Sequence, residues 1–185
     1  MSTLDNSIAI GVVPLSLRRA SANRGLARAA VAHLGPAGEL ILIDDLPLFS
    51  QDHEVADGEP ALAEGRRWRE SVRGCDALLF CTPEYDAYPP AMAINALNWL
   101  SREPEPPLKG KPVAIAGAAA GFRGSRRSQA HLRLILDTIG ARTIEQHFYV
   151  QIADRFDSEG NLTDPEALEQ FGSFLDSVVA DLEAR

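Results

Sequence analysis

Hydrophobic residues occur along this chain in two alternating patterns. Short runs without polar residues, typical of parallel strands covered on both faces, alternate with segments whose apolar residues return at helical spacing. The pattern predicts strands at residues 7–13, 40–43, 77–81, 113–117 and within 142–150. It predicts helices at residues 22–34, 60–73, 91–100, 126–139 and from about 163 to 182. Five strands separated by helices indicate an α/β fold, a parallel and doubly wound three-layer sandwich.

The length and the charge narrow this picture. At 185 residues, without an internal repeat or a long linker, residues 1–185 are expected to form a single domain. The formal net charge of −8 argues against nucleic acid and anionic membranes as partners. No apolar run approaches the ~20 residues of a membrane helix, and the N-terminus has no basic stretch before an apolar run. We therefore expect a cytoplasmic protein with no membrane partner.

The run "LLFCTPEYDAYPPAMAINALNWLSR" joins a buried strand to a helix through a polar, proline-stiffened loop. In an open α/β sheet, ligands bind just beyond the carboxyl ends of the strands, which is where this loop lies. An aromatic side chain at this place can stack on a flat ring. The alternative is a rigid turn whose tyrosine covers its own core. The candidate residues of this second loop are Pro83, Glu84, Tyr85 and Asp86.

The first strand leads into "PLSLRRASANRGLA", where a helix begins at about residue 22. Free N–H groups and the positive end of the helix dipole favour an anion there, so a phosphate is a natural ligand. The alternative is that Ser21 only caps the helix and that Arg18 is a solvated surface charge. The sequence is neither a Walker loop nor a dinucleotide fingerprint. The candidate donors of this first loop are Ser16, Arg18, Ser21 and Asn23.

The fourth strand runs into a third loop, residues 117–124, which is made mostly of small residues. Small residues let a ligand approach the backbone closely, although tight packing alone would also explain them. All three loops fall at the same edge of the predicted sheet, and this coincidence favours one ligand site.

Other kinds of chemistry have little support. Cys75 and Cys81 flank one strand without zinc or redox spacing and are expected to be buried. The four histidines are scattered, so we expect no metal site. Asp44 and Asp45 are interpreted as shaping the loop after the second strand. No glycine-framed nucleophile elbow is present.

Taken together, these stretches resemble the NADPH-dependent FMN reductase family, the flavodoxin-like group that includes chromate and quinone reductases. The likeness covers most of the chain and rests on "SLRRASANRGLA", "DDLPLFSQD", "TPEYDAYPPAMAINALNWLSR" and "KPVAIAGAAAGFRGSRRSQAHLR". The third segment is the most specific. The resemblance implies a flavodoxin-like sheet with strand order 2-1-3-4-5.

The resemblance also implies roles for individual residues. The FMN phosphate would be held by Ser16, Arg18, Ser21 and Asn23. The loop along the isoalloxazine would be Pro83, Glu84, Tyr85 and Asp86. The flavin's other edge would be closed by Gly117 and Ala118. Tyr85 and Arg102 would face the substrate, with Arg102 at the flavin mouth and near a dimer partner; a salt bridge at the helix end is the alternative for this arginine.

The activity that the resemblance implies is an FMN-dependent NAD(P)H oxidoreductase. Hydride would pass from NADPH or NADH to flavin N5 and then, in ping-pong order, to a quinone, flavin, azo compound or metal-oxyanion acceptor. No catalytic residue separate from the flavin is expected. The family implies a homodimer, in some members a tetramer.

Two departures from the family keep a second hypothesis open. The family has Gly where this chain has Leu15, and it favours Asn where this chain has Asp86. A bulky side chain at 15 can crowd the phosphate, and a carboxylate at 86 cannot donate as an amide does. The alternative is therefore a flavodoxin-like binding or regulatory module with weakened FMN affinity. An esterase or other phosphate-handling enzyme on the same scaffold is a third hypothesis.

Overall fold

The computed structural model of the protein describes residues 8–54, 62–102 and 106–184. Its centre is a five-stranded parallel sheet of order β2-β1-β3-β4-β5, as predicted. The strands are β1 (Ile10–Pro14), β2 (Gly38–Leu40), β3 (Ala77–Cys81), β4 (Pro112–Ala119) and β5 (Arg142–Gln151). The flavodoxin-like α/β fold expected from the sequence is confirmed.

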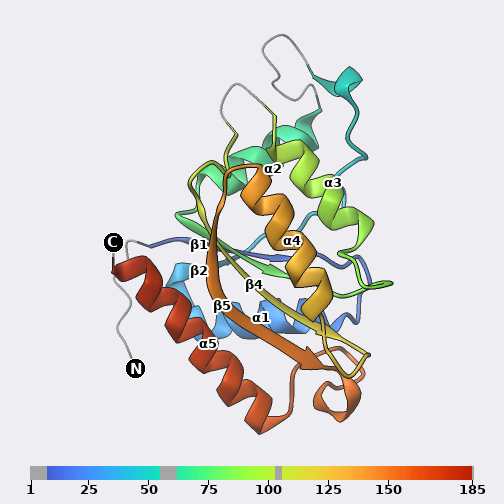
Figure 1. The fold of residues 1–185 in the computed structure, drawn as a ribbon, viewed down its shortest axis with the longest axis vertical. Coiled ribbons are helices and arrows are strands. Elements are labelled where there is room, and N and C mark those ends of the chain that lie inside the picture. Colours follow the sequence, from blue (N-terminus) through green and yellow to red (C-terminus); the bar gives the residue numbers. More distant parts are fainter. Residues whose placement is uncertain (1–7, 55–61, 103–105, 185) are drawn as a thin grey trace.

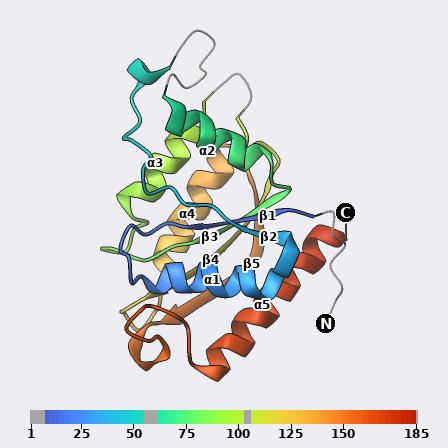
Figure 2. The same ribbon diagram turned by 180° about the vertical axis from the view of Figure 1, so that it is seen from behind.

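In the described part of the chain, five α-helices cover the two faces of the sheet (Figures 1 and 2). They are α1 (Ala22–Leu34), α2 (Ala63–Arg73), α3 (Ala91–Leu100), α4 (Arg126–Thr138) and α5 (Pro165–Glu183). In Figure 1, α1 and α5 lie below the sheet, and α2, α3 and α4 lie above it.

Each face of the sheet has its own core because side chains alternate along a strand. On β3, Leu79 and Cys81 pack towards α1 and α5, whereas Leu78 and Phe80 pack towards α2, α3 and α4. All residues of β3 are buried, which explains the apolar run without alternation.

Some predicted boundaries differ from the structure. The second strand ends at Leu40, although the sequence predicted residues 40–43. Ile41 and Ile43 are buried as expected. Among the described residues, however, the only backbone hydrogen bond from this segment to β1 beyond Leu40 is the one from Ile41 N to Val12 O, at 2.9 Å. A short 3₁₀ turn, Gln51–His53, lies in a predicted loop. Residue 7 of the first predicted strand and residues 60 and 61 of the second predicted helix lie outside the described residues.

The carboxyl ends of the strands meet at one edge of the sheet, at the right in Figure 1 and at the left in Figure 2. The β1–α1, β3–α3 and β4–α4 loops, which are the three candidate loops, all start from this edge. Within the part of the chain that the structure describes, no helix is long and apolar enough to cross a membrane.

Candidate functional site

The first loop ends at the start of α1 with two hydroxyl groups. Ser21 is the N-cap, and its Oγ accepts a hydrogen bond from Asn23 N at 3.2 Å, which leaves its own proton free to donate. Ser16 is also buried, and none of the hydrogen bonds of the described residues uses its hydroxyl. Arg18 is exposed beside them. The capping role of Ser21 is therefore real, and it leaves donors for an anion.

Asn23 ties the first loop to β4. Its Oδ1 accepts from Ala118 N and its Nδ2 donates to Ala118 O, both at 2.9 Å. Both atoms of this buried amide are thus engaged by one backbone unit 95 residues away. Asn23 fixes the distance between two of the candidate loops.

Arg24 is a residue of this loop that sequence reasoning missed. Its Nε donates to Ser16 O at 3.0 Å, and its Nη2 pairs with Asp44. A positive charge in the first turn of a helix opposes the helix dipole, so Arg24 needs such partners, and this was the available signal. Asp44 shapes its loop through this pair, and Asp45 does so through Arg67, in line with the interpretation from sequence.

The second loop is a tight two-residue turn. Tyr85 and Tyr88 exchange both backbone hydrogen bonds, at 3.0 and 2.8 Å, and the residues between them, Asp86 and Ala87, have φ of 50° and 70°. Positive φ at both central positions is typical of a type I′ turn, which favours Asn, Asp or Gly at the first of them. Tyr85 is 54% exposed, so the alternative that its ring covers the core is wrong.

Two side chains hold this turn against α4. Glu84 Oε2 accepts from the backbone N–H groups of Arg127 and Ser128, at 2.8 and 3.1 Å, and thereby caps α4 from another loop. The His131 ring stacks on Tyr88 with ring centres 4.3 Å apart, and its Nδ1 lies 3.1 Å from Ala87 O. The Glu84 carboxylate is therefore engaged by α4, and Tyr85 offers the free aromatic face.

The third loop packs closely on the second. A Cβ atom on Gly117 would come closer than 3.0 Å to both Ser125 Oγ and the Thr82 carbonyl oxygen. Thr82 Oγ1 also lies 3.2 Å from Ser128 Oγ. The tight-packing explanation thus holds for Gly117, and the packing brings the second and third loops together.

The two departures from the family have local explanations. Leu15 is 2% exposed and packs in the core beneath α2, α3 and α4, so its side chain lies away from the first loop. Its N–H donates to Cys81 O at 2.9 Å, and its φ is not positive. Asp86 occupies a position of positive φ, where Asn and Asp are both tolerated.

Arg102 lies away from the other predicted residues. It follows the last residue of α3, a helix of 10 residues that runs roughly 15 Å from the second loop. Its Nε pairs with Glu54 Oε1 at 2.7 Å, and its guanidinium lies 5.4 Å from the centre of the Phe49 ring. The alternative, a salt bridge at the helix end, is therefore correct within one chain. Arg102 and Tyr85 do not meet within one chain.

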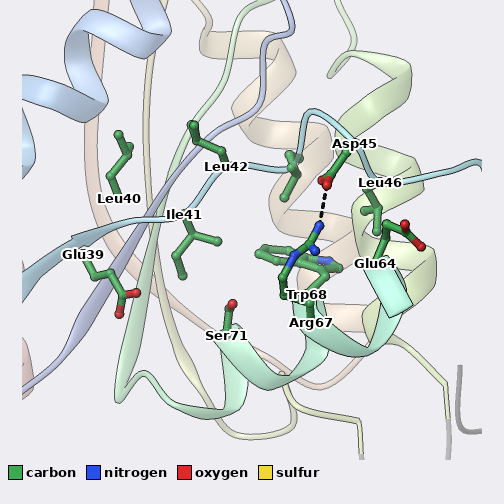
Figure 3. A pocket seen from close by; sticks show the side chains of 11 residues that line it. Glu39, Leu40, Ile41, Leu42, Asp45, Leu46, Glu64, Arg67, Trp68 and Ser71 are labelled. Atoms are coloured by element: carbon green, nitrogen blue, oxygen red, sulfur yellow. Dashed lines mark hydrogen bonds and ion pairs between the residues drawn. The ribbon is translucent and has the colours of Figure 1, made fainter. Parts of the chain in front are cut away.

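A hollow of about 170 Å³ between residues 39–46 and α2 is separate from these loops (Figure 3). Trp68 and Ile41 form its apolar floor, and the ion pair of Asp45 with Arg67 lies at its rim. None of the residues predicted to bind a ligand lines it.

The cysteines and the possible metal ligands are the other reactive groups to consider among the described residues. Among residues 8–54, 62–102 and 106–184, no cluster of three or more His, Cys, Asp or Glu side chains could hold a metal ion. Burial raises the pKa of both the Cys75 and the Cys81 thiols. Both cysteines are buried and free, as the sequence predicted.

The donor set fits a phosphorylated mononucleotide with a flat ring. Ser16, Ser21 and Arg18 offer donors at the positive end of α1, and Tyr85 offers a face across the edge of the sheet. A doubly wound parallel sheet with these loops at its carboxyl edge defines a flavodoxin-like, mononucleotide-binding protein.

Comparisons with known proteins identify the family. The family model for NADPH-dependent FMN reductases matches residues 8–154. An NAD(P)H-dependent FMN reductase of Pseudomonas aeruginosa is 37% identical over 158 residues, which cover 83% of this chain and 84% of that protein. A probable NADPH:quinone oxidoreductase of Oryza sativa is 37% identical over 188 residues, 97% of this chain and 91% of that protein.

Among solved structures, the flavoenzyme NAD(P)H:(acceptor) oxidoreductase FerB from Paracoccus denitrificans has a TM-score of 0.83 at 28% identity, covering 96% of this chain and 98% of its own. The chain belongs to the NADPH-dependent FMN reductase family. The predicted class, an oxidoreductase that uses FMN and NAD(P)H, is confirmed.

Proposed function

We propose that this enzyme holds FMN at the carboxyl edge of the sheet and passes hydride from NAD(P)H to a quinone. The observation that carries the proposal is that hydrogen bonds to β4 and α4 fix the candidate loops in place. Asn23 joins the first to the third, and Glu84 joins the second to α4. Loops fixed in this way need little further ordering when a cofactor binds.

The first loop would hold the phosphate. The hydroxyl protons of Ser16 and Ser21, the Arg18 guanidinium and the free N–H groups of the first turn of α1 are its donors. Arg24, which holds the Ser16 carbonyl and pairs with Asp44, keeps this loop in place. Asn23, predicted as a phosphate ligand, contributes chiefly by fixing the loop on Ala118.

The second and third loops would border the flavin ring. Tyr85 supplies an aromatic face, Asp86 supplies an acceptor on the turn, and Pro83 and Glu84 fix the path of the loop into α4. Gly117 and Ala118 bring the backbone of β4 close to the opposite edge. Bound FMN would supply the hydride chemistry, and the chain supplies position and electrostatics without a separate acid or base.

A quinone is the acceptor that the site favours. Tyr85 is more than half exposed at this edge, so a flat aromatic acceptor can approach beside it. Relatives that are 33% to 37% identical include a 2-hydroxy-1,4-benzoquinone reductase of a Burkholderia species and the Oryza sativa enzyme named above. Free flavin is the second candidate acceptor, since the Pseudomonas aeruginosa relative is an FMN reductase.

The proposal includes a homodimer and a cytoplasmic location, where NAD(P)H is available. Tyr88 and Leu134 are 59% and 67% exposed, and Tyr88 stacks on His131, which lies three residues before Leu134 on α4. Residues three apart share a face of a helix, so these side chains form one apolar surface beside the second loop. Sedimentation of a Leu134→Glu variant tests it: the dimer is expected to dissociate, and an unchanged sedimentation coefficient would contradict this surface.

The proposed function is tested by flavin retention and reduction. The purified protein is mixed with FMN, desalted and titrated with NADPH and then with benzoquinone under argon. We expect flavin absorbance to be retained, bleached by NADPH and restored by benzoquinone. Arg18→Ala is expected to weaken FMN binding about tenfold or more, because it removes a charged phosphate contact. The matched control is Arg19→Ala, which removes the neighbouring exposed charge. A colourless protein that retains no FMN would favour the binding-module hypothesis instead.

A further inference from the structure

A groove lies between the start of α4 and the edge strand β5. Its larger part, of about 540 Å³, is lined by Phe122, Arg123, Arg126, Arg127, Ala130 and Tyr149. A smaller part, of about 160 Å³, shares Arg126, Ala130 and Tyr149 with it and adds Gln129, Arg133 and His147. We call the two parts together the α4–β5 groove. None of its lining residues has a role in the proposed flavin site.

The α4–β5 groove is basic in a protein whose net charge is −8. Four arginines and no carboxylate line it. Among the ion pairs of the described residues, none involves Arg123, Arg126 or Arg127. Three guanidinium groups that share one hollow repel one another, so a bound anion would stabilise them.

The positive charge comes from these side chains and not from the helix terminus. Glu84 already occupies the N–H groups of Arg127 and Ser128 at the start of α4. Arg133 is engaged by the carbonyl oxygens of Ile144 and Gln146, at 2.6 and 3.1 Å. The guanidinium groups free to fork around an oxyanion are therefore those of Arg123, Arg126 and Arg127.

Flat surfaces accompany the charge. Phe122 is 79% exposed, and the Arg123 guanidinium lies 5.0 Å from its ring centre. Tyr149 is 42% exposed, and the Arg126 guanidinium lies 5.6 Å from its ring centre. Aromatic rings and guanidinium planes both stack on nucleobases. The N–H groups of the guanidinium also bind phosphate. The combination suits a purine nucleotide better than a simple inorganic anion.

The groove adjoins the proposed flavin site. Phe122 and Arg123 belong to the third loop, whose first residues, Gly117 and Ala118, border the proposed flavin position. In Figure 1, α4 and β5 both extend to this edge of the sheet. A ligand that reached from the flavin into the groove would carry a purine and an extra phosphate at its far end.

We infer that the α4–β5 groove binds the adenosine 2′-phosphate end of NADPH and gives the enzyme a preference for NADPH over NADH. This inference rests on the proposed function, in which NAD(P)H delivers hydride at the neighbouring edge. Arg126 and Arg127 bind the 2′-phosphate, while Phe122 and Tyr149 offer faces to the adenine. NADH, which has a hydroxyl in place of this phosphate, leaves the arginines without an anionic partner.

The inference is tested by calorimetric titration with adenosine 2′,5′-bisphosphate and adenosine 5′-monophosphate, on the protein before and after loading with FMN. We expect the bisphosphate to bind at least about tenfold more tightly, as a charged hydrogen-bonded contact provides. Arg126→Ala is expected to remove this difference and to raise KM for NADPH about tenfold, with KM for NADH unchanged. Arg127→Ala is a second variant with the same expected effect. The control is Lys109→Ala, which removes an exposed positive charge outside the groove.

The outcomes separate this inference from the proposed function. Equal affinity for the two nucleotides would overturn the inference about the groove without affecting flavin reduction. An unchanged difference in affinity in both arginine variants would do the same. Loss of self-association in Arg126→Ala with unaltered nucleotide binding would also overturn it. A protein that retains no FMN but still discriminates the bisphosphate would support the groove and refute the proposed function.

Discussion

Asn95 and Trp99, one turn apart on α3, both donate a hydrogen bond to the carbonyl oxygen of Pro47. The distances are 2.9 Å from Asn95 Nδ2 and 2.8 Å from Trp99 Nε1. Asn95 Oδ1 also accepts from Phe49 N at 2.8 Å. The Asn-x-x-x-Trp spacing, which in the sequence marked only a resemblance, therefore anchors the loop between the second strand and α2.

Replacement of Asn95 by Leu tests this anchor. The variant keeps the size of the side chain but leaves Phe49 N without its partner in a half-buried place, so it is expected to lower the free energy of unfolding by about 1–3 kcal/mol. Urea unfolding followed by tryptophan fluorescence measures the loss. The control is Asn98→Leu, on the exposed face of the same helix. A similar loss in both variants would argue against the anchor.

Replacement of Leu15 tests whether this residue serves the core or weakens the phosphate loop. Because its side chain is buried between the sheet and the helices above it, Leu15→Ala is expected to lower the free energy of unfolding by about 2–5 kcal/mol. The FMN affinity is expected not to rise, since the side chain lies away from the loop. Chemical unfolding and FMN titration measure the two effects, with Leu17→Ala, at a half-exposed position, as control. Tighter FMN binding in Leu15→Ala would restore the hypothesis of a weakened site.

Gly117 allows the second and third loops to meet. The Cβ of Gly117→Ala would collide with the Thr82 carbonyl, a backbone atom that no rotamer change can move, so we expect a loss of about 3 kcal/mol or more. Gly121→Ala, in the same loop, has open space around its Cβ and is expected to change stability by less than about 0.5 kcal/mol. Thermal unfolding of the two variants compares them directly. Equal melting temperatures would mean that the loops are not in close contact.

The elements of this fold could be predicted because each depends on local sequence. Three of the five strands, β1, β3 and β4, are apolar runs that the structure buries, and α1 and α5 start at or close to the predicted residues 22 and 163. The second strand was placed too late because Ile41 and Ile43 are buried beside β1 without continuing the ladder. Burial is visible in an apolar pattern, whereas the extent of strand pairing is not.

The partners within the site depend on contacts between distant segments. Asn23 and Ala118 are 95 residues apart, and nothing local in either segment indicates that they form two hydrogen bonds. In the sequence Glu84 is one carboxylate in a polar loop, and its role as a cap of α4 is visible only in the folded structure. The resemblance places Arg102 at the flavin mouth and near a dimer partner, and within one chain it pairs with Glu54, a contact that the sequence did not indicate. The sequence predicted that these three loops meet at one edge of the sheet, but it did not predict the atoms that hold them together.

Ala87 holds a left-handed conformation that suits glycine. Its φ of 70° costs an L-residue roughly 1–2 kcal/mol, so Ala87→Gly is expected to raise the free energy of unfolding by up to about 1 kcal/mol after the entropic penalty of glycine. Ala32→Gly, at an exposed position within α1, is the control and is expected to lower it by about 0.5–1 kcal/mol. Urea unfolding of both variants shows whether each substitution raises or lowers the free energy of unfolding. A loss in both would show that the turn is not strained at Ala87.

His147 links the stability of the edge strand to pH. Burial lowers the pKa of this imidazole, and the positive charge of Arg133 lowers it further. Arg133 Nη2 lies 2.7 Å from His147 Nδ1, a contact that requires this ring nitrogen to be unprotonated. In the unfolded chain the pKa returns to about 6.5, so between the two values the unfolded state binds more protons than the folded state.

It follows that stability falls as the pH drops through about 6.5 towards the lower pKa of the folded protein, because protons then favour unfolding. His147→Gln keeps an acceptor for Arg133 but does not titrate, so its free energy of unfolding is expected to fall less between about pH 7.5 and about pH 5.5. The carboxylates are the same in both proteins, so their contributions to the pH dependence of stability cancel in the comparison. Identical pH profiles would mean that His147 has the same proton affinity in both states, and that the Arg133 contact does not persist in solution.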